Sequence, residues 1–444
     1  MIGLTGQGKS KFLASMFVQL LNQGTGCALI DPHGDLATDS LGTLVDAGFF
    51  ARPGAAKRLL YVDFGQRSRY VPFNVLRQPY GDHAVARNVV EACKRAWPAL
   101  ADGAAPQFEN ILLAGSLVLI QNQLSLTDLP RLLADGVYRG RLLERVTDKD
   151  VVDFFRSRFD RWGRDAALMV ESTLRRVFLL TFSPALKGSL GHPENSLNFR
   201  KLMDDGVSII FNLGGLDEDT QRLLGCLITV GFEDAALSRA EIPEEQRRQY
   251  HLIIDEFSQF SAQSEESLAR VLSLARKYGL HLTLAHQTWS QVNSRLQGAL
   301  QNAVTVAFRL GRSDAEWAAP QFGRFDPYAL KHQVTDPAQV DRTHPVYFNL
   351  QETFEGWTQT LMDLRPRELF VRVGRNTARL KSLSVPRPRC SSAELQAVTE
   401  RYAKTLLRQS DDSFRRAAES EALTGPAVQR MVPVADQLVD PAAG

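Results

Sequence analysis

The sequence predicts an α/β protein in which a largely parallel sheet is interrupted by an all-helical insertion. Three observations lead to this class. Short apolar runs that end in polar residues alternate with helical patterns in both halves of the chain, as parallel strands with crossover helices require. Between about residues 80 and 200 the patterns are almost entirely helical. A glycine-rich stretch, GLTGQGKS (residues 3–10), opens the first helix.

Composition sets broad limits. The 444 residues suffice for two or three domains, and the net charge of +2 neither requires nor excludes a nucleic-acid partner. The cysteines lie far apart in the sequence, at Cys27, Cys93, Cys226 and Cys390. This spacing argues against a disulfide framework or a zinc cluster, and it fits a reducing compartment. No apolar run reaches the ~18–20 residues that a membrane helix needs, so we expect a cytoplasmic chain.

Residues 1–79 are predicted to form the N-terminal part of the core. After the glycine-rich loop, apolar residues recur at helical spacing between Phe12 and Leu21, and Gly24 is a plausible end of that helix. A short apolar strand follows from Cys27 to Ile30, and a second strand spans residues 58–65.

Residues 80–200 are predicted to be the helical insertion, and residues 201–385 to complete the core. The apolar strand patterns return in four segments: 206–214, 250–257, 279–287 and 303–311. Residues 386–444 are predicted to hold one helix, within SSAELQAVTERYAKTLLRQ, and then a Pro/Ala/Gly-rich tail without periodicity.

The loop at residues 3–10 has the G-x-x-x-x-G-K-S pattern of a phosphate-binding loop. Glycines let successive backbone N–H groups face phosphate oxygens, and the following helix adds its N-terminal partial charge. In this pattern Lys9 reaches the β and γ phosphates, and the Ser10 hydroxyl binds Mg²⁺. ATP and Mg²⁺ are therefore the predicted ligands, and the predicted binding residues are Gly3, Thr5, Gly6, Gln7, Gly8, Lys9, Ser10 and Lys11.

A hydrolysing phosphate loop needs an acidic residue at the end of a neighbouring strand to hold Mg²⁺. Asp31 and Asp255 each end an apolar strand, but only Asp255 is followed by a second carboxylate, Glu256. Two adjacent carboxylates can have separate roles: Asp255 can bind the metal ion, and Glu256 can act as the general base that activates water. We therefore favour this pair over Asp31.

A polar residue also ends the strand at residues 279–287. Gln287 could contact the γ-phosphate and orient water there, although a glutamine after a strand is common. His281 and His286 lie five residues apart on opposite faces of a strand, so a shared metal ion is not expected.

Ring-forming phosphate-loop ATPases usually receive an arginine from a neighbouring subunit to neutralise charge in the transition state. The candidates in this sequence are Arg276, Arg309 and Arg312, with Arg175 and Arg176 in the insertion as further options. We favour Arg276 and Arg309, although each alone also fits a solvated surface residue.

The order of these motifs resembles the HerA/FtsK group of DNA-pumping ATPases, in particular the branch of conjugative coupling proteins and type IV secretion ATPases. The resemblance runs from Met1 to about Val385. It rests on GLTGQGKS, LIDPHGDLA, PFNVL, the helical insertion, LIIDEFSQF, ARKYGLHLTLAHQ and FRLGRSDAE, in that order. His286 is a departure, because relatives usually have a small or hydroxyl residue there.

The resemblance implies a RecA-like P-loop NTPase core, a hexameric ring and a central channel for DNA. It implies Walker A roles for Lys9 and Ser10, Walker B and catalytic roles for Asp255 and Glu256, and a sensor role for Gln287. It places Asp31 outside the Walker B motif. Type IV secretion or relaxosome proteins are the further partners that it implies.

Only Met1 and Ile2 precede the loop, whereas such a loop normally follows a buried strand. We therefore expect an N-terminally truncated chain whose longer form could reach the inner membrane through the missing region. Two other functions stay open: a secretion ATPase of the same fold that moves protein, and a nucleotide-binding switch subunit that does not hydrolyse.

Overall fold

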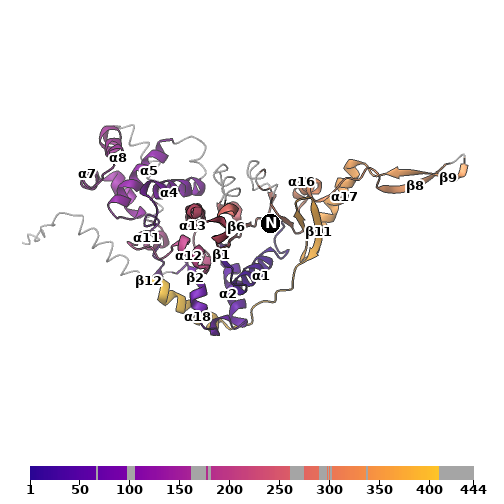
Figure 1. Cartoon of the computed structure of the whole chain (residues 1–444), viewed down its shortest axis with the longest axis horizontal. Helices are drawn as coiled ribbons and strands as arrows, with labels where there is room; N and C mark the ends of the chain where they lie inside the picture. The colour runs from indigo at the N-terminus through magenta and orange to yellow at the C-terminus, as the bar shows by residue number, and fades with distance from the viewer. Residues whose placement is uncertain are drawn as a thin grey trace, which may run out of the picture.

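The computed structural model describes residues 1–409 apart from 67–68, 98–105, 162–176, 179–181, 261–274, 290–297, 299, 301–302 and 337–338. A central sheet carries helices on both faces, with the helical insertion at one side and a smaller antiparallel sheet at the other (Figure 1). Among the described residues, no helix combines the length and the apolar character that a bilayer crossing requires.

The central sheet is entirely parallel and has the strand order β2-β4-β1-β5-β6. The strands are β1 (Gly26–Asp31), β2 (Leu59–Asp63), β4 (Ser208–Asn212), β5 (Tyr250–Ile254) and β6 (Leu280–Leu284). All six residues of β1 are buried, which is the pattern expected of a central strand that is covered on both faces. The predicted α/β class with a parallel sheet is confirmed.

The two faces of the sheet belong to separate apolar clusters because side chains alternate along each strand. Cys27 and Leu29 pack on one face with helices α1 (Lys9–Asn22), α2 (Asp35–Asp46) and α18 (Ser392–Leu406). Ala28 and Ile30 pack on the other face, in the cluster that also contains α12 (Phe199–Asp205) and α13 (Glu218–Leu237).

In the segment predicted as the insertion, the described regular elements are helices, joined by turns and by one isolated β-bridge at Asn195. Its helices are α4 (Asp82–Ala96), α5 (Pro106–Gln121), α6 (Leu129–Ala134), α7 (Gly136–Leu143), α8 (Lys149–Asp153) and α11 (Pro184–Leu190). Helix α4 packs on α13 of the core, and there Arg95 donates from Nη1 and Nη2 to the two carboxylate oxygens of Glu233, each at 2.7 Å. Both side chains are buried.

Helix α13 also contacts the end of the central sheet. The Nε2 atom of Gln221, in its first turn, donates to the carbonyl oxygens of Pro32 at 2.9 Å, Leu213 at 3.2 Å and Leu216 at 3.1 Å. Pro32 and Leu213 directly follow β1 and β4. One helix therefore joins the carboxyl edge of the sheet to the helical insertion.

A second sheet, which is antiparallel, has the order β11-β10-β7. Its strands are β7 (Thr305–Ala307), β10 (Glu368–Val373) and β11 (Asn376–Lys381). Between β7 and β10 lie helices α16 (Arg312–Phe322) and α17 (Leu350–Met362), and between these the hairpin of β8 (Leu330–Asp336) and β9 (Gln339–Tyr347). The hairpin extends away from the body of the protein (Figure 1). Of these strands, only β7 lies in a segment predicted from the sequence.

Ile2 connects the two sheets. It forms parallel bridges with His286, just beyond β6, and with Ala307 of β7. Its N–H donates to Val306 at 2.9 Å, and its carbonyl oxygen accepts from Phe308 at 3.0 Å. Although only two residues precede the glycine-rich loop, they therefore occupy a strand position between β6 and β7.

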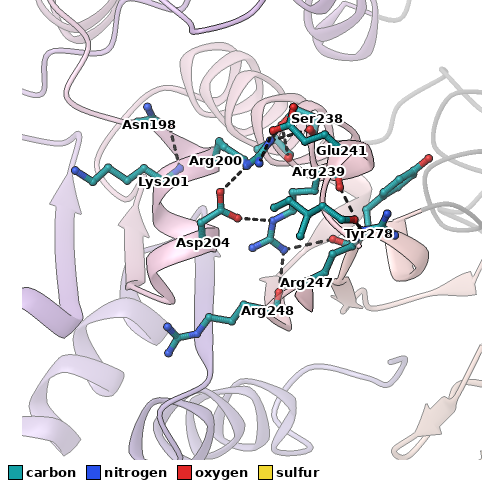
Figure 2. A network of polar contacts seen from close by, with 12 residues as sticks. Asn198, Arg200, Lys201, Asp204, Ser238, Arg239, Glu241, Arg247, Arg248 and Tyr278 are labelled. Atoms are coloured by element: carbon teal, nitrogen blue, oxygen red, sulfur yellow. Dashed lines mark hydrogen bonds and ion pairs between the residues drawn. The ribbon is translucent and has the colours of Figure 1, made fainter. Parts of the chain in front are cut away.

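An arginine network lies at the amino ends of β5 and β6 (Figure 2). Arg239 is fully buried and donates from Nε to Asp204 at 2.8 Å and from Nη1 to the carbonyl oxygens of Arg248 and Tyr278 at 2.8 and 3.3 Å. Arg247 lies over the ring of Tyr278, 4.9 Å from its centroid. These contacts hold together three chain segments that enter the sheet at this edge.

The remaining elements are short. Strands β3 (Arg69–Tyr70) and β12 (Arg408–Gln409) pair with each other, and α3 (Ala55–Arg58) precedes β2. Single turns of other helix types occur at Phe49–Ala51, Leu126–Asp128, Phe154–Arg158, Phe159–Arg161, Ser238–Glu241, Glu244–Gln246, Phe257–Phe260 and Ala275–Tyr278. The predicted C-terminal helix corresponds to α18, and the predicted Pro/Ala/Gly-rich tail, residues 425–444, lies outside the described residues.

The buried pair between α4 and α13 generates a stability prediction. Replacing Arg95 with methionine leaves the Glu233 carboxylate buried without its partner, which should lower the free energy of unfolding by ~3–5 kcal/mol. Replacing both residues with methionine should recover much of that loss, because no unpaired charge remains buried. Urea denaturation followed by circular dichroism measures both effects.

Arg222→Met is the matched control on α13. Arg222 pairs with the exposed Glu218 four residues earlier, and such surface pairs contribute only about 0.3–0.5 kcal/mol. Equal losses in the Arg95 and Arg222 variants would contradict the stabilising role of the buried Arg95–Glu233 pair between the insertion and the core.

Candidate nucleotide-binding site

The glycine-rich loop connects Ile2 to the first turn of α1. Gly6 and Gly8 have φ angles of 77° and 103°, in the region that side chains with a Cβ rarely adopt. Gly3 is restricted for another reason, because a Cβ there would lie only 2.7 Å from the Cβ of Phe308. The loop therefore needs glycine at all three positions, two for conformation and one for close packing.

Lys9 is buried and points back over its own loop. Its Nζ donates to the carbonyl oxygens of Gly3 at 2.5 Å and Leu4 at 3.2 Å. Burial lowers the pKa of the Lys9 ammonium, and the nearby carboxylates of Glu256 and Asp255 oppose that shift. The ammonium is thus held beside the loop and close to the two predicted acidic residues.

Asp255 directly follows β5 and is buried at the same edge of the sheet. Its Oδ2 accepts from the Ser10 hydroxyl at 3.4 Å, although the two residues are 245 positions apart. Burial, together with the negative charges of Glu256 and Asp31, raises the pKa of Asp255 to about 6. A buried carboxylate in this position is well suited to a cation that neutralises it.

The carboxylate of Asp31, the competing acidic residue, already accepts hydrogen bonds from the backbone of the turn that follows it. Asp31 is the last residue of β1, the strand next to β5, and its two oxygens accept from the backbone N–H groups of His33 at 2.9 Å and Ala37 at 2.8 Å. Burial raises its pKa, and these hydrogen bonds act in the opposite direction. Asp31 therefore fixes the turn into α2, whereas Asp255 is the carboxylate that contacts Ser10.

Glu256 belongs to a short chain of side-chain hydrogen bonds. Gln287 donates from Nε2 to Glu256 Oε1 at 3.0 Å, and the hydroxyl of Thr5 donates to Gln287 Oε1 at 3.2 Å. Glu256 also has a φ of 45°, a strained conformation for a residue with a side chain. The loop, the acidic pair and the glutamine therefore meet at one edge of the sheet, and Thr5 links them.

The two histidines near this strand do not meet. His286 is buried beyond the carboxyl end of β6, bonds through Nδ1 to the carbonyl oxygen of Thr288 at 3.0 Å, and packs on Trp289. Burial lowers its pKa to about 3, so the ring is neutral. His281 lies near the amino end of β6, where it stacks on His251.

The predicted arginines lie in different places. The carbonyl oxygen of Arg309 accepts from the N–H of Leu4 at 2.9 Å, so its backbone touches the loop of its own chain, and its side chain is exposed. Arg276 lies before the amino end of β6, at the opposite edge of the sheet from Glu256. Arg312 pairs with Glu316 and Glu355. Arg175 and Arg176 lie outside the described residues.

One residue near the loop was missed by the sequence analysis. The backbone N–H of Arg367 donates to the carbonyl oxygen of Gln7 at 3.2 Å. The only local signal was the Arg-Pro-Arg turn at residues 365–367, which does not indicate a contact with a loop more than 350 residues earlier.

The residues present are suited to binding a nucleoside triphosphate and a divalent cation. The space beyond Gly6 is open, as a loop that receives phosphates requires, and the α1 N-terminus begins at Lys9. Ser10 and the buried Asp255 supply the hard oxygen ligands that Mg²⁺ prefers. Bound Mg²⁺ would neutralise charge on the phosphates, and Glu256 and Gln287 lie next to that position.

Comparison with known proteins supports the fold. No family model and no curated protein sequence matches this chain. Its structure is similar to that of the bacterial conjugative coupling protein TrwB, with a TM-score of 0.59 and 17% identity over 88% of this chain and 86% of that one. TrwB in complex with ADP and Mg²⁺ gives a TM-score of 0.55 with 18% identity over the same shares.

VirB4 of Thermoanaerobacter pseudethanolicus is also similar, with a TM-score of 0.54 and 13% identity over 87% of this chain and 88% of that one. At these identities the likeness concerns the fold. This chain has the RecA-like P-loop NTPase fold of TrwB and VirB4.

Proposed function

We propose that this chain is an ATPase that couples ATP hydrolysis to the movement of DNA. The observation that carries the proposal is the meeting of the phosphate loop with the acidic pair and the glutamine. Ser10 contacts Asp255 at 3.4 Å, and Gln287 contacts Glu256 at 3.0 Å, all at the carboxyl edge of a parallel sheet. Ligands of open α/β sheets bind at this edge.

Each residue has a distinct task in this proposal. Lys9 leaves the carbonyl oxygens of its own loop to contact the β and γ phosphates, while Ser10 and Asp255 hold Mg²⁺. Glu256 accepts a proton from the attacking water, and Gln287 keeps the Glu256 carboxylate oriented through its amide. Thr5, bonded to Gln287, connects this glutamine to the loop that holds the phosphates.

The coupling to DNA rests on the fold. TrwB is described as a conjugative coupling protein, and it has been seen with a non-hydrolysable ATP analogue and with ADP and Mg²⁺. We propose that this chain forms a ring, a hexamer, with DNA as cargo and with type IV secretion or relaxosome proteins as partners. Arg276, which is remote from the site of its own chain, would then act on the site of a neighbouring subunit. Arg309 would act beside the loop of its own chain.

The first prediction concerns turnover. The purified chain should hydrolyse ATP faster when DNA is present, and Lys9→Ala should abolish the activity because the phosphates lose their main cation. Glu256→Gln should lower kcat by roughly 10²–10⁴-fold, the usual contribution of a general base, while nucleotide binding persists. A phosphate-release assay with and without DNA measures these rates.

Lys57→Ala, at an exposed lysine of α3, is the control and should leave the rate unchanged. Equal rates with and without DNA would contradict the DNA proposal and favour a secretion ATPase with protein cargo. Nucleotide binding without turnover in the assembled protein would instead favour a non-hydrolysing switch subunit.

The second prediction concerns the buried carboxylate of Asp255. Its pKa of about 6 lies above the ordinary value of 3.8, so the charged form destabilises the folded chain at neutral pH. Asp255→Asn should therefore raise the free energy of unfolding at pH 7–8 by ~3 kcal/mol, since each pH unit between the two pKa values corresponds to ~1.4 kcal/mol. This gain should shrink as the pH falls from 6 to 4.

Thermal unfolding across this pH range, without nucleotide, measures the gain, and Asp363→Asn at an exposed position is the control. Adding ATP and Mg²⁺ should stabilise the wild-type chain more than Asp255→Asn, because the variant lacks the proposed metal ligand. A variant that is no more stable than the wild type at pH 8 would contradict the burial of a charged Asp255.

A further inference from the structure

Arg367 lies against the phosphate loop from the side of the second sheet. Its backbone N–H donates to the carbonyl oxygen of Gln7 at 3.2 Å. In a trans peptide the C=O and N–H groups point in opposite directions. The bond therefore fixes the Gln7–Gly8 peptide with the Gly8 N–H directed away from Arg367, so the turn before β10 helps to set the orientation of a loop amide.

The backbone of Arg367 has a conformation that normally requires glycine. The N–H of Glu368 donates to the carbonyl oxygen of Arg365 at 2.9 Å, with Pro366 and Arg367 between them, and Arg367 has a φ of 73°. These are the features of a type II turn, whose third residue is usually Gly or Asn because of its positive φ. An arginine is strained at this position, and such strain is typical of functional sites.

The side chain of Arg367 runs beside Gly8. A Cβ built on Gly8 would lie 3.8 Å from Cγ of Arg367, so the stem of the arginine passes next to the last glycine of the loop. Arg367 is half-buried, and its guanidinium makes no hydrogen bond or ion pair with any residue that the structure describes. A side chain whose stem lies beside the loop thus carries five N–H donors that are unused within the described part of the chain.

We propose that Arg367 binds phosphate oxygens of the nucleotide held by the loop of the same chain. A guanidinium can donate two parallel hydrogen bonds to a phosphate, which the point charge of Lys9 cannot do. The inference deepens the proposed function and rests on it, because it needs a nucleotide in the loop. It also gives the strained turn a purpose, since glycine would fit the backbone but could not supply the contact.

Two variants separate the side chain from the turn. Arg367→Gly keeps the backbone N–H to Gln7 and relieves the positive φ, so its thermal midpoint should equal or exceed that of the wild type. Arg367→Gln keeps a long side chain and the strain but removes the charge. Both should bind ATP roughly ten- to a hundredfold more weakly, the usual effect of losing a hydrogen bond from a charged group.

Isothermal titration of the full chain with ATP and Mg²⁺ measures the affinities. Arg365→Ala is the matched control, because it removes the same charge from an exposed position in the same turn and should bind ATP like the wild type. Arg367→Lys should recover part of the affinity.

The outcomes are distinguishable. If the wild type and Lys9→Ala bind ATP equally poorly, the proposed function itself fails. If the wild type binds ATP and Lys9→Ala does not, the loop is a nucleotide site. In that case, an affinity for ATP equal to that of the wild type in either Arg367→Gly or Arg367→Gln would overturn the role of Arg367. An equal loss in Arg365→Ala would also overturn it, by showing that the effect is a general one of charge.

Discussion

The strand position of Ile2 is the contact on which the arrangement of this protein depends. Ile2 bridges His286 beyond β6 on one side and Ala307 of β7 on the other. Met1 makes the hydrogen bonds toward β6, and Ile2 makes those toward β7. The phosphate loop begins at the next residue, and the packing of Gly3 against Phe308 leaves no room for a side chain. Met1 and Ile2 thus set the position of the loop relative to Gln287 on one side and Arg309 on the other. Backbone hydrogen bonds make this junction, and the Ile2 side chain is buried in the apolar cluster that also contains Trp289 and Phe370.

Much of the core and of the site could be predicted from local sequence. The phosphate loop is recognisable because its chemistry depends on residues within eight positions, and apolar runs that end in acids mark buried parallel strands. The choice of Asp255 over Asp31 followed from one neighbouring carboxylate, Glu256. The structure supplies a physical reason for the difference, since the oxygens of Asp31 accept backbone N–H groups of the turn into α2.

The rest depends on contacts between distant segments, which no local pattern shows. Thr5 and Gln287 are 282 positions apart, and Arg367 reaches the loop only because β10 pairs with β7. The strands β8 and β9 are exposed along most of their described length, so they lack the alternation of buried and exposed residues that reveals a strand in sequence. Arg276 was favoured as an arginine that acts on a neighbouring subunit, and it lies at the edge of the sheet opposite Glu256 of its own chain.

Helix α13 is held at two points, Gln221 and Glu233, and this arrangement couples the movements of the parts that it joins. Gln221 joins its first turn to the chain leaving β1 and β4, and Glu233 joins its last quarter to Arg95 of the insertion. The anchors are separated by twelve residues, or ~18 Å of helix. Because an α-helix is stiff along its axis, a tilt of ~5° at Gln221 would displace Glu233 by ~1.5 Å. The insertion is therefore coupled to the carboxyl edge of the sheet: as long as Arg95 stays paired with Glu233, the insertion moves whenever the turn after β1 tilts α13.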